Sequence, residues 1–371
     1  MTVSLRRERT KRFVEALWAR KDQMVDAIVS DGWPRKMTHA GLAMHRKSWD
    51  VETIAQGLEE ELSAVQTSAV HRLVWPSSVH HIWPALPGAG LTPVLVAMLL
   101  DIPQAIRPSS RGTAFAQQVK DIGGPPLVEP GENWRDTDLV VVSGTDETLQ
   151  QIRQMMSGRG RVVGYGHRVS FALVVDDKPE SVDVATIADA LATDVVMWRQ
   201  SGCFSVRAVL FCGSKERRRA FCRNLARAIG RREREWGADD APDVLLQARA
   251  QALGVAQMRG EVFCEGIGFV RCEDAPFTGR QEAINSVTVH SVDDVDALQQ
   301  VVDIAAHQIQ GVALAGAWRT EANAWIDTLA RLGATRIAEP GTMQCPSARW
   351  WHDGRPNGLD WARVVTVESH S

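Results

Sequence analysis

The feature that most constrains the fold of this chain is a regular alternation of apolar and amphipathic segments between residues 79 and 164. The apolar segments are short, resemble strands and end near glycine, serine or proline, while segments with helical periodicity separate them. The expected strands are 79–83, 104–108, 138–142 and 161–164, and the expected helices are 91–100, 113–122 and 146–156. This alternation predicts a doubly wound parallel sheet, which binds ligands at the carboxyl ends of its strands.

The rest of the chain divides around this pattern. Residues 1–70 have helical periodicity, and strand and helix segments alternate again after Cys203, with a helix expected from Val295 to Ile309. Because 371 residues are enough for about two domains, we expect N-terminal helices and a dinucleotide-binding domain in residues 1–200. A second α/β domain is expected in residues 201–344. Residues 345–371 would return to the first domain or join an oligomer interface.

The net charge of −3 gives no electrostatic reason to expect a nucleic-acid or anionic-membrane partner. The runs 215–219 and 231–235 mix both signs of charge and predict one exposed helix face. The longest apolar stretch, 91–100, is too short to span a bilayer, and the polar N-terminal stretch does not resemble a signal peptide. We therefore expect a cytoplasmic protein whose six cysteines are mainly buried thiols, without a zinc motif or a disulfide framework.

Cys203 is the candidate nucleophile. It lies in the segment WRQSGCFS, residues 198–205, between the apolar segments 194–197 and 206–211, which predict a strand–turn–strand junction. Gly202 permits the close approach of a substrate, and a thiol at such a turn can form a thioester with an acyl group. The alternative is a structural thiol packed in the core. No histidine is close in sequence, so the sequence leaves open whether a histidine activates the thiol.

Two polar turns predict a nucleotide site. The first, Arg107-Pro108-Ser109-Ser110, and the second, Ser143-Gly144-Thr145, each precede an expected helix and are expected to end adjacent strands. Free amide groups at a helix start attract phosphate, although capping by serine or threonine is the ordinary alternative. The G-x-G-x-x-G fingerprint is absent. The positive charge of Arg107 beside the two serines favours a 2′-phosphate, and hence NADPH.

The order of these motifs resembles that of the aldehyde dehydrogenase superfamily. Within it, the chain looks like the LuxC-type acyl-CoA reductases, the reductase component of bacterial fatty-acid reductase complexes. The resemblance covers about residues 80–210 and 340–365, and the Gly-Cys segment and the late Trp-rich segment are its most specific parts. The matching stretches are HIWPALPGAGL, AIRPSS, VVSGTDETLQQIR, VVGYGHRVSFALV, DVVMWRQSGCFSVR and GTMQCPSARWWHDGR.

The resemblance implies the superfamily fold and a two-step reaction. An acyl thioester, carried by CoA or by a carrier protein, would acylate Cys203 in the catalytic domain of residues 201–344, and NADPH would reduce the bound acyl group to an aldehyde. An acyl-activating synthetase partner and a homo-oligomer are also implied. The residues that would hold the nucleotide are Arg107, Ser109, Ser110, Ser143, Gly144, Thr145, Gly164 and Gly166.

Two alternatives remain open. The first is an oxidising aldehyde dehydrogenase, whose thioester is hydrolysed with the help of a glutamate in a Glu-Leu-Gly-Gly motif, but the matching strand here reads Val163-Gly164-Tyr165-Gly166 without a carboxylate. The second is a catalytically impaired subunit of an acyl-transfer complex. It is suggested by Ala85, which stands where the family usually has an oxyanion-hole asparagine, and loss of one such donor costs about 10²–10³-fold in rate.

Overall fold

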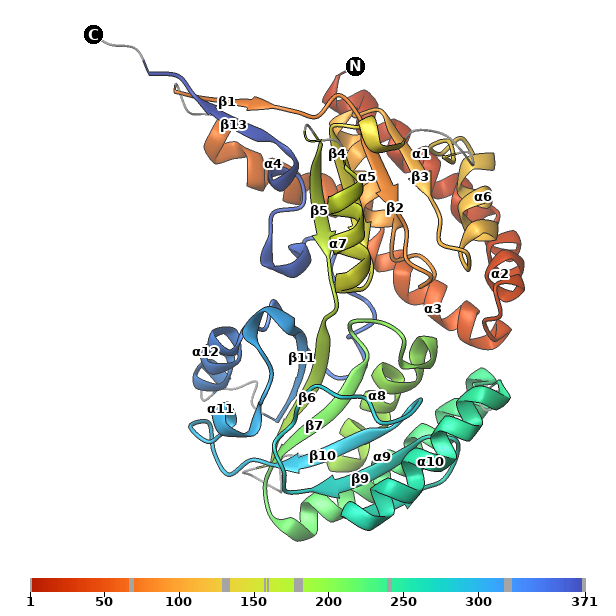
Figure 1. Cartoon of the computed structure of the whole chain (residues 1–371), viewed down its shortest axis with the longest axis vertical. Coiled ribbons are helices and arrows are strands. Elements are labelled where there is room, and N and C mark those ends of the chain that lie inside the picture. The colour runs from red at the N-terminus through yellow and green to blue at the C-terminus, as the bar shows by residue number, and fades with distance from the viewer. Residues whose placement is uncertain are drawn as a thin grey trace. The chain divides into compact units, whose positions relative to one another are not determined.

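The computed structural model describes residues 2–66, 70–128, 134–156, 158, 160–176, 183–238, 242–316 and 322–368 (Figure 1). Its internal contacts divide the chain into two compact units. Unit 1 contains residues 1–33, 42–167 and 347–371, and unit 2 contains residues 34–41 and 168–346. The expected boundary at residue 200 therefore differs from the boundary in the structure, which lies between His167 and Arg168.

The reason for this difference is a strand that the sequence pattern did not reveal. Strand β6 (Val169–Val175) pairs in parallel with β7 (Val206–Cys212) and with β11 (Ile309–Ala315), so it belongs to the sheet of unit 2. Every residue of β6 is buried, as is typical of a strand in the middle of a parallel sheet.

Unit 1 is built on a parallel four-stranded sheet with the strand order β3-β2-β4-β5. Its strands are β2 (Val79–Ile82), β3 (Gln104–Arg107), β4 (Leu139–Ser143) and β5 (Arg161–Tyr165), and helices α5 (Leu91–Leu100), α6 (Thr113–Asp121) and α7 (Asp146–Met155) connect them. The alternation predicted from the sequence for residues 79–164 is therefore confirmed, and so is the doubly wound α/β class.

The remaining elements of unit 1 come from both ends of the chain. Strand β1 (His71–Val74) pairs antiparallel with β13 (Arg363–Thr366), so the C-terminal segment contacts the N-terminal part of the same unit. The helices are α1 (Val3–Ala19), α2 (Lys21–Ser30), α4 (Val51–Gln66), the later part of α3 (Arg35–Ser48) and the short turns η1 (Trp134–Asp136), η4 (His352–Gly354) and η5 (Leu359–Trp361).

Unit 2 is built on a seven-stranded sheet with the order β12-β11-β6-β7-β10-β9-β8, in which only the edge strand β8 runs antiparallel to its neighbour. The further strands are β8 (Glu261–Cys264), β9 (Phe269–Glu273), β10 (Val287–Ser291) and β12 (Arg336–Ala338). The helices are α8 (Val184–Val196), η2 (Met197–Gln200), α9 (Lys215–Trp236), α10 (Asp243–Arg259), α11 (Leu298–Val301), η3 (Ala306–Gln308) and α12 (Ala322–Leu332).

Helices cover both faces of this second sheet. Leu210 of β7 packs in a core with Leu298 of α11 and Leu329 of α12. On the other face, Phe211 contacts Phe221 of α9, with 5.3 Å between the ring centroids.

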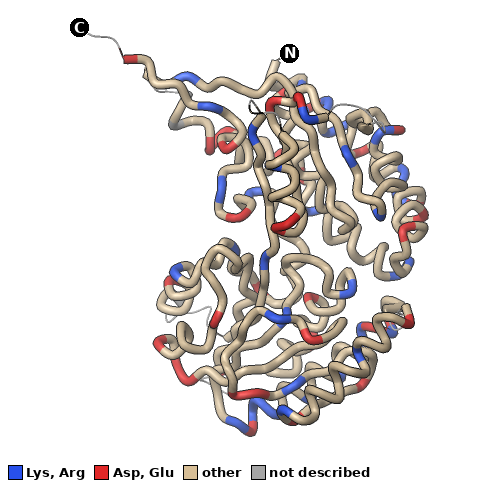
Figure 2. Tube along the Cα trace, in the orientation of Figure 1, with Lys and Arg blue, Asp and Glu red and all other residues tan. Residues whose placement is uncertain are grey.

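The charged residues of α9 are mixed in sign (Figure 2). Arg217, Arg219 and Arg231 pair with acidic side chains. Arg218 and Glu233 are buried, so the prediction that both charged runs form one exposed face was wrong for these two residues.

Three local expectations were wrong. Residues 194–197 form the end of α8 and the start of η2, so the turn before Cys203 joins a helix to a strand. The helix expected from Val295 to Ile309 is limited to the short segments α11 and η3. Cys222 of α9 and Cys272 of β9 are bonded as a disulfide, because α9 packs on β9 and brings the two side chains together.

None of the helices in the described part of the chain has both the length and the apolar character that a membrane-spanning helix needs.

Candidate active site

The predicted nucleotide residues lie along one edge of the sheet of unit 1. Arg107, Ser109 and Ser110 follow β3, residues 143–145 follow β4, and Gly164 and Gly166 follow β5, so all are at the carboxyl ends of parallel strands. The two polar turns do not end adjacent strands, however, because β2 lies between β3 and β4. The chain passes from β2 to β3 on one side and then crosses to β4 on the other, which makes the end of β2 a topological switch point.

The amino end of α6 has the features of an anion site. The side chain of Ser109 is half-buried, and its Oγ has no hydrogen-bond partner among the described residues. Gly112 precedes the helix without a side-chain cap, so its first amide groups keep their donors. The guanidinium of Arg107 is exposed and lies 5.0 Å from the ring centroid of Trp134. A cation, a hydroxyl and helix amide groups therefore occur together at this end of β3.

The amino end of α7 differs in its charge. The Thr145 hydroxyl accepts a hydrogen bond from the Thr148 amide at 3.2 Å and thereby caps the helix. Asp146 and Glu147 place two carboxylates in the first turn, where they interact favourably with the helix dipole. The Gly144 amide donates to the carbonyl of Tyr165 at 3.1 Å. The contacts of this turn are thus those of capping and of strand pairing.

The turn after β5 is held by side chains of the late Trp-rich segment. The Arg355 guanidinium donates to the Gly164 carbonyl at 2.9 Å and lies 4.9 Å from the ring centroid of Tyr165. His352 stacks on the same tyrosine ring with 3.5 Å between centroids. Burial raises the pKa of Tyr165, the single tyrosine of the chain, despite the nearby charge of Arg355. The late Trp-rich segment therefore fixes the Gly164–Gly166 turn.

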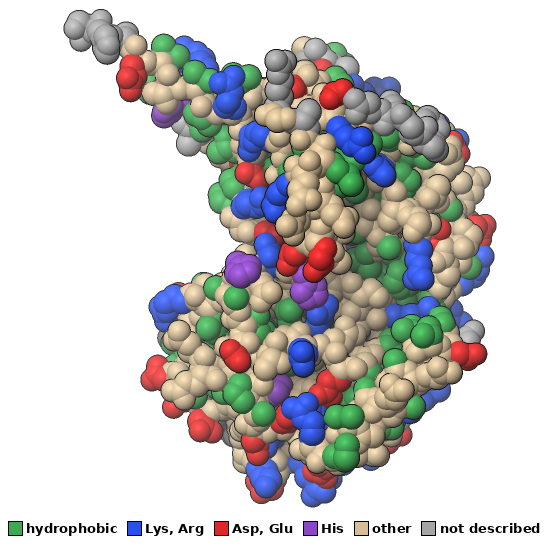
Figure 3. Space-filling view, in the orientation of Figure 1, with side chains coloured by type: hydrophobic (Ala, Val, Ile, Leu, Met, Phe, Trp, Pro, Cys, Tyr) green, Lys and Arg blue, Asp and Glu red, His purple; other side chains and the backbone are tan. Residues whose placement is uncertain are grey.

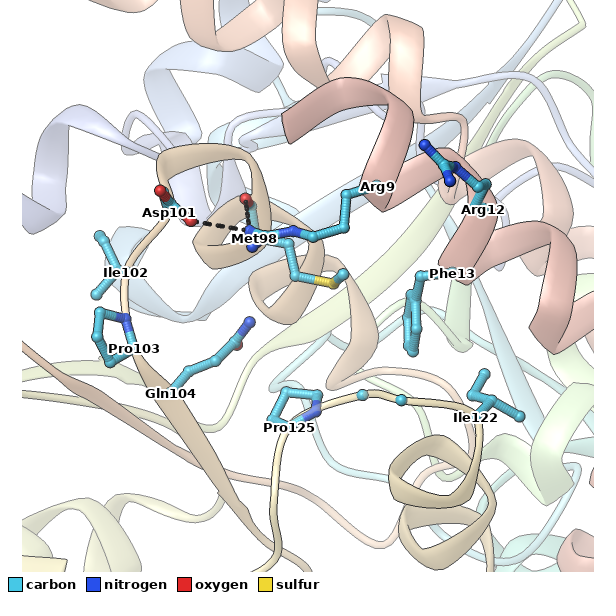
Figure 4. A pocket seen from close by; sticks show the side chains of 12 residues that line it. Arg9, Arg12, Phe13, Met98, Asp101, Ile102, Pro103, Gln104, Ile122 and Pro125 are labelled. Atoms are coloured by element: carbon cyan, nitrogen blue, oxygen red, sulfur yellow. Dashed lines mark hydrogen bonds and ion pairs between the residues drawn. The ribbon is translucent and has the colours of Figure 1, made fainter. Parts of the chain in front are cut away.

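A cavity of about 610 Å³ lies at the opposite end of the same sheet (Figure 4). It is lined by Phe13 and Arg9 of α1, by Met98 at the end of α5 and by Gln104 at the start of β3. Arg9 donates to the Met98 carbonyl at 2.9 Å and pairs with Asp101 at 3.1 Å, so it closes the carboxyl end of α5. Because this cavity is at the amino end of β3, it does not contain the predicted nucleotide residues.

Cys203 lies in unit 2, just before β7, at the amino edge of the second sheet. It is half-buried, and its carbonyl accepts a hydrogen bond of 2.8 Å from the Ser170 hydroxyl on the neighbouring strand β6. The rule that ligands bind at the carboxyl ends of parallel strands therefore does not describe the position of this thiol. Its position is determined by the chain that connects α8 to β7.

That connection contains three consecutive residues with left-handed backbone conformation. The φ angles of Trp198, Arg199 and Gln200 are 53°, 50° and 58°. Each such residue other than glycine costs about 1–2 kcal/mol, and outliers of this kind persist only where the surrounding structure holds them. The left-handed turn redirects the chain from the end of α8 to Cys203.

Two side chains of this turn hold it in place. Gln200 is buried and donates to the carbonyls of Val206 and Ser286 at 2.7 and 3.0 Å, while its carbonyl oxygen accepts from the Ser286 amide at 3.1 Å. The Trp198 side chain is 1% exposed and packs against Gly41, where a Cβ atom would collide with the indole ring. None of these left-handed residues is a glycine, so this geometry could not be predicted from the residue types.

Two half-buried arginines lie within electrostatic range of the Cys203 sulfur. Burial lowers the pKa of Arg207, and the charge of Cys203 acts in the opposite direction. Burial also lowers the pKa of Arg336, against the raising effects of Asp194, Cys345 and Cys203. The Arg336 guanidinium lies 5.0 Å from the ring centroid of Phe204, next to Cys203. Sequence reasoning assigned no role to either arginine: Arg207 is the last residue of the matching stretch DVVMWRQSGCFSVR, and Arg336 lies outside the matching stretches.

Asp194 connects the nucleophile turn to the loop 339–345. Its carboxylate is fully buried at the end of α8 and accepts hydrogen bonds from the amides of Gly341 and Met343 at 2.6 and 2.9 Å. The next residue of the loop, Gln344, donates to the Ser205 hydroxyl at 3.1 Å. Burial raises the pKa of Asp194 to about 7, while the two amides and the charge of Arg336 act to lower it.

The raised pKa of Asp194 predicts a specific dependence of stability on pH. The unfolded carboxyl titrates near 3.8 and the folded one near 7, so the folded state binds more protons between these values. Stability from this group is fully present below about pH 4 and is lost as the pH rises through 7, by up to about 4 kcal/mol. Urea titrations at several pH values should show this loss. Between pH 4 and pH 7, the free energy of unfolding of the wild type should fall relative to that of Asp194→Asn.

A matched control for this measurement is Asp189→Asn, which changes an exposed carboxylate on the same helix. Asp189 pairs with Arg231 at 2.6 Å with both side chains about half exposed, and such surface pairs contribute at most about 1 kcal/mol. The free energies of unfolding of the wild type and of Asp194→Asn could instead differ by a constant amount from pH 4.5 to pH 8. That result would show that the titration of buried Asp194 does not control the dependence of stability on pH.

Comparisons with known proteins agree with this geometry. Solved structures of an oxidoreductase and of aldehyde dehydrogenases match 99% of the chain at low sequence identity, which shows the fold. An oxidoreductase from Marinobacter aquaeolei is 14% identical with a TM-score of 0.72 over 86% of its chain. A mutant of aldehyde dehydrogenase C from Pseudomonas syringae, complexed with NAD+ and octanal, is 14% identical with a TM-score of 0.69 over 84% of its chain.

An aldehyde dehydrogenase from Bartonella henselae is 11% identical with a TM-score of 0.71 over 87% of its chain. No curated protein matches the sequence. A family model described as acyl-CoA reductase (LuxC) matches residues 131–363, which include the Gly164 turn, the Cys203 turn and the Trp-rich segment. Because this match covers more than half of the chain, the protein belongs to the LuxC family of acyl-CoA reductases and is an oxidoreductase of this kind.

Proposed function

We propose that the protein reduces an acyl thioester, of CoA or of a carrier protein, to an aldehyde with NADPH, and that Cys203 carries the acyl group between the two steps. One observation carries this proposal: a half-buried thiol follows a strained left-handed turn and lies within electrostatic range of two guanidiniums. Neighbouring cations favour the thiolate, which is the nucleophilic form of cysteine. Membership of the LuxC family supports the same chemistry.

In the first step, the Cys203 thiolate attacks the carbonyl carbon of the acyl thioester. The bond between that carbon and the carrier sulfur breaks, the carrier leaves as a thiol after taking up a proton, and a new thioester joins the acyl group to Cys203. When bound, NADPH supplies a hydride for the second step. The resulting hemithioacetal anion on Cys203 collapses by breaking its carbon–sulfur bond, which releases the aldehyde and restores the thiolate.

The nucleotide would bind at the carboxyl edge of the unit 1 sheet. Arg107, Ser109 and Ser110 offer a cation and hydroxyl groups to a 2′-phosphate, and the unpartnered Ser109 Oγ supports an anionic ligand there. The turns of residues 143–145 and 164–166 would contact the rest of the cofactor. The Pseudomonas syringae relative, whose structure contains NAD+, supports a nicotinamide nucleotide in this fold.

An oxidising aldehyde dehydrogenase is less well supported. Hydrolysis of the thioester needs a base near the acyl group, and position 164, where the resemblance would place it, is a glycine. A Cβ atom at Gly164 would collide with Leu149, so a longer side chain does not fit there without rearrangement. The impaired-subunit alternative depends on Ala85, which is exposed in the loop after β2. It predicts no turnover with any acyl thioester.

The test is a turnover assay with purified protein, NADPH and acyl-CoA of several chain lengths. We expect NADPH oxidation that requires the acyl thioester and produces one aldehyde and one free CoA thiol per nucleotide. The oxidising alternative predicts instead that an aldehyde alone, without a thiol acceptor, drives formation of NADPH or NADH. If neither reaction occurs while acyl-CoA still binds, the catalytic proposal is wrong and the impaired-subunit alternative stands.

Replacement of Arg107 tests the cofactor preference. Arg107→Gln should raise the KM for NADPH about 10–100-fold, because a charge-assisted hydrogen bond to the 2′-phosphate contributes about 1.5–3 kcal/mol. The KM for NADH should change by less than about 2-fold. Arg135→Gln is the matched control, since Arg135 lies 5.7 Å from the ring centroid of the same Trp134. Equal effects of Arg107→Gln on both nucleotides would contradict a role in selecting the 2′-phosphate.

A further inference from the structure

Two thiols lie near the guanidinium of Arg336 in unit 2. Cys203 and Cys345 are both half-buried, and the disulfide of the structure joins two other cysteines, Cys222 and Cys272. Burial lowers the pKa of Arg336, and the charges of Cys203 and Cys345 both act to raise it, so both sulfurs lie within electrostatic range of this one guanidinium. The reaction proposed above uses the sulfur of Cys203 and gives that of Cys345 no role.

Hydrogen bonds hold Cys345 beside the nucleophile turn. The Arg336 guanidinium donates to the Cys345 carbonyl at 3.3 Å. Gln344 donates to the Ser205 hydroxyl at 3.1 Å, and both of these side chains are buried. This bond joins the residue just before Cys345 to the second residue after Cys203, so the two cysteines belong to segments that lie side by side.

The side chain of Arg336 links the same two segments. Its guanidinium donates to the carbonyls of Thr342 and Met343, each at 2.9 Å, and lies 5.0 Å from the ring centroid of Phe204. Phe204 follows Cys203 directly in the chain. Because these contacts already order the backbone of both segments, little conformational entropy remains to be lost when the two sulfurs form a bond.

Cys203 is the thiol that an oxidant should modify first. The guanidiniums of Arg207 and Arg336 both act on Cys203, and cations next to a cysteine favour its thiolate. The thiolate is the form that peroxides oxidise, and the first product is a sulfenic acid. A sulfenic acid condenses with a neighbouring thiol to give a disulfide. Cys345 lies where such a second thiol is needed.

A small and uncharged oxidant suits this pair of thiols. Both sulfurs are half-buried, so a bulky oxidant reaches them less easily than a small one. On the face of unit 2 that Figure 3 shows, basic and acidic side chains are interspersed among the described residues, so this face attracts neither an anionic nor a cationic oxidant in particular. Hydrogen peroxide has the size and the neutrality that these observations favour.

We propose that Cys345 is a resolving thiol, which joins Cys203 in a reversible disulfide after hydrogen peroxide has oxidised Cys203. The inference rests on the thiolate of Cys203, which the proposed function also requires, but it does not depend on turnover. The disulfide removes the nucleophile of the acylation step. It also protects Cys203 from further oxidation to the sulfinic acid, which a dithiol does not reduce.

The oxidation has two steps. In the first, the Cys203 thiolate attacks one oxygen of hydrogen peroxide, the oxygen–oxygen bond breaks, and the departing hydroxide takes up a proton to become water. In the second, the Cys345 sulfur attacks the sulfur of the sulfenic acid. The sulfur–oxygen bond breaks, the disulfide bond forms, and the hydroxyl group leaves as water with the proton of the Cys345 thiol. The two sulfurs together lose two electrons, which reduce one peroxide to two waters.

Peptide mapping tests the pairing. Fully reduced protein is freed of reductant, treated with hydrogen peroxide, blocked with N-ethylmaleimide and digested without reduction. Mass spectrometry should show a linked pair of peptides that contain Cys203 and Cys345, and dithiothreitol should separate them. Cys264→Ala is the matched control, because the exposed Cys264 sulfur also lies beside a guanidinium, 2.9 Å from that of Arg249. This variant should keep the linked pair.

Replacement of Cys345 by alanine tests its role as the resolving thiol. The contacts of Cys345 described above are made by its backbone carbonyl, so Cys345→Ala should fold, as circular dichroism can verify. After peroxide and then dithiothreitol, the fraction of Cys203 that N-ethylmaleimide labels should be at least about 10-fold lower in Cys345→Ala than in the wild type, because oxidation beyond the sulfenic acid is irreversible.

Two results would overturn the inference. One is absence of the linked pair in the wild type at peroxide concentrations that oxidise the exposed Cys264. The other is equal recovery of the Cys203 thiol in the wild type and in Cys345→Ala. A linked pair in a protein without acylation or turnover would support this inference and contradict the proposed function, whereas acylation of Cys203 without a linked pair would do the reverse.

Discussion

Replacement of Cys203 by serine should abolish covalent acylation and lower NADPH-dependent turnover by at least about 10³-fold. The thiolate is the group that forms the bond to the acyl carbon, and a serine hydroxyl at neutral pH does not reach comparable nucleophilicity without a base. Removal of a catalytic nucleophile commonly costs this much or more. Intact-mass spectrometry after incubation with an acyl-CoA should show the added acyl mass on the wild-type protein and none on Cys203→Ser.

The chain offers a matched control for this experiment. Cys264 is an exposed thiol in unit 2 at the edge strand β8, so it is more accessible to nonspecific acylation than the half-buried Cys203. Cys264→Ala should keep both the acyl adduct and the turnover. If Cys203→Ser retains turnover, or if the adduct disappears in Cys264→Ala, then Cys203 is not the acyl carrier and the proposed mechanism is wrong, whatever the activity of the protein.

The sequence predicted the first sheet well because its strands alternate with helices that have one apolar face. It failed around residues 169–197 for a physical reason. Strand β6 is buried on both faces and therefore lacks the alternating pattern of a half-exposed strand. The end of α8 is a short apolar run, and such a run cannot be assigned to a strand or a helix by periodicity alone.

The candidate site was predictable only in part. Cys203 was found because glycine and serine around a cysteine are a local signal. Arg336, Asp194 and Arg355 were not, because they reach the site through contacts over long sequence separations, such as the 191 residues between Arg355 and Gly164. The left-handed conformation of residues 198–200 was also hidden, since residues other than glycine adopt it here under tertiary constraint.

The same constraint makes Gln200 the residue whose loss should disturb the nucleophile turn most. Gln200→Leu keeps the size of the side chain but removes two donated and two accepted hydrogen bonds, the second acceptor contact being with the Gln281 amide at 3.0 Å. The buried carbonyls of Val206 and Ser286 then lose a donor, at about 1–3 kcal/mol each, while the Ser286 amide keeps the Ala283 carbonyl at 3.3 Å as its acceptor. We expect at least about 3 kcal/mol of destabilisation, measured by urea unfolding.

Gln310 provides the matched comparison, because it is a buried glutamine on β11 whose side-chain amide has no hydrogen-bond partner among the described residues. Gln310→Leu replaces an unsatisfied polar group by an apolar one, so it should leave stability unchanged or increase it. The acylation rate, measured by stopped flow, should also differ between the two variants. We expect a rate at least about 10²-fold lower in Gln200→Leu, because the turn relaxes from its left-handed geometry. Equal stability of the two variants would mean that the hydrogen bonds of Gln200 do not hold the turn, and the strain before Cys203 would then need a different explanation.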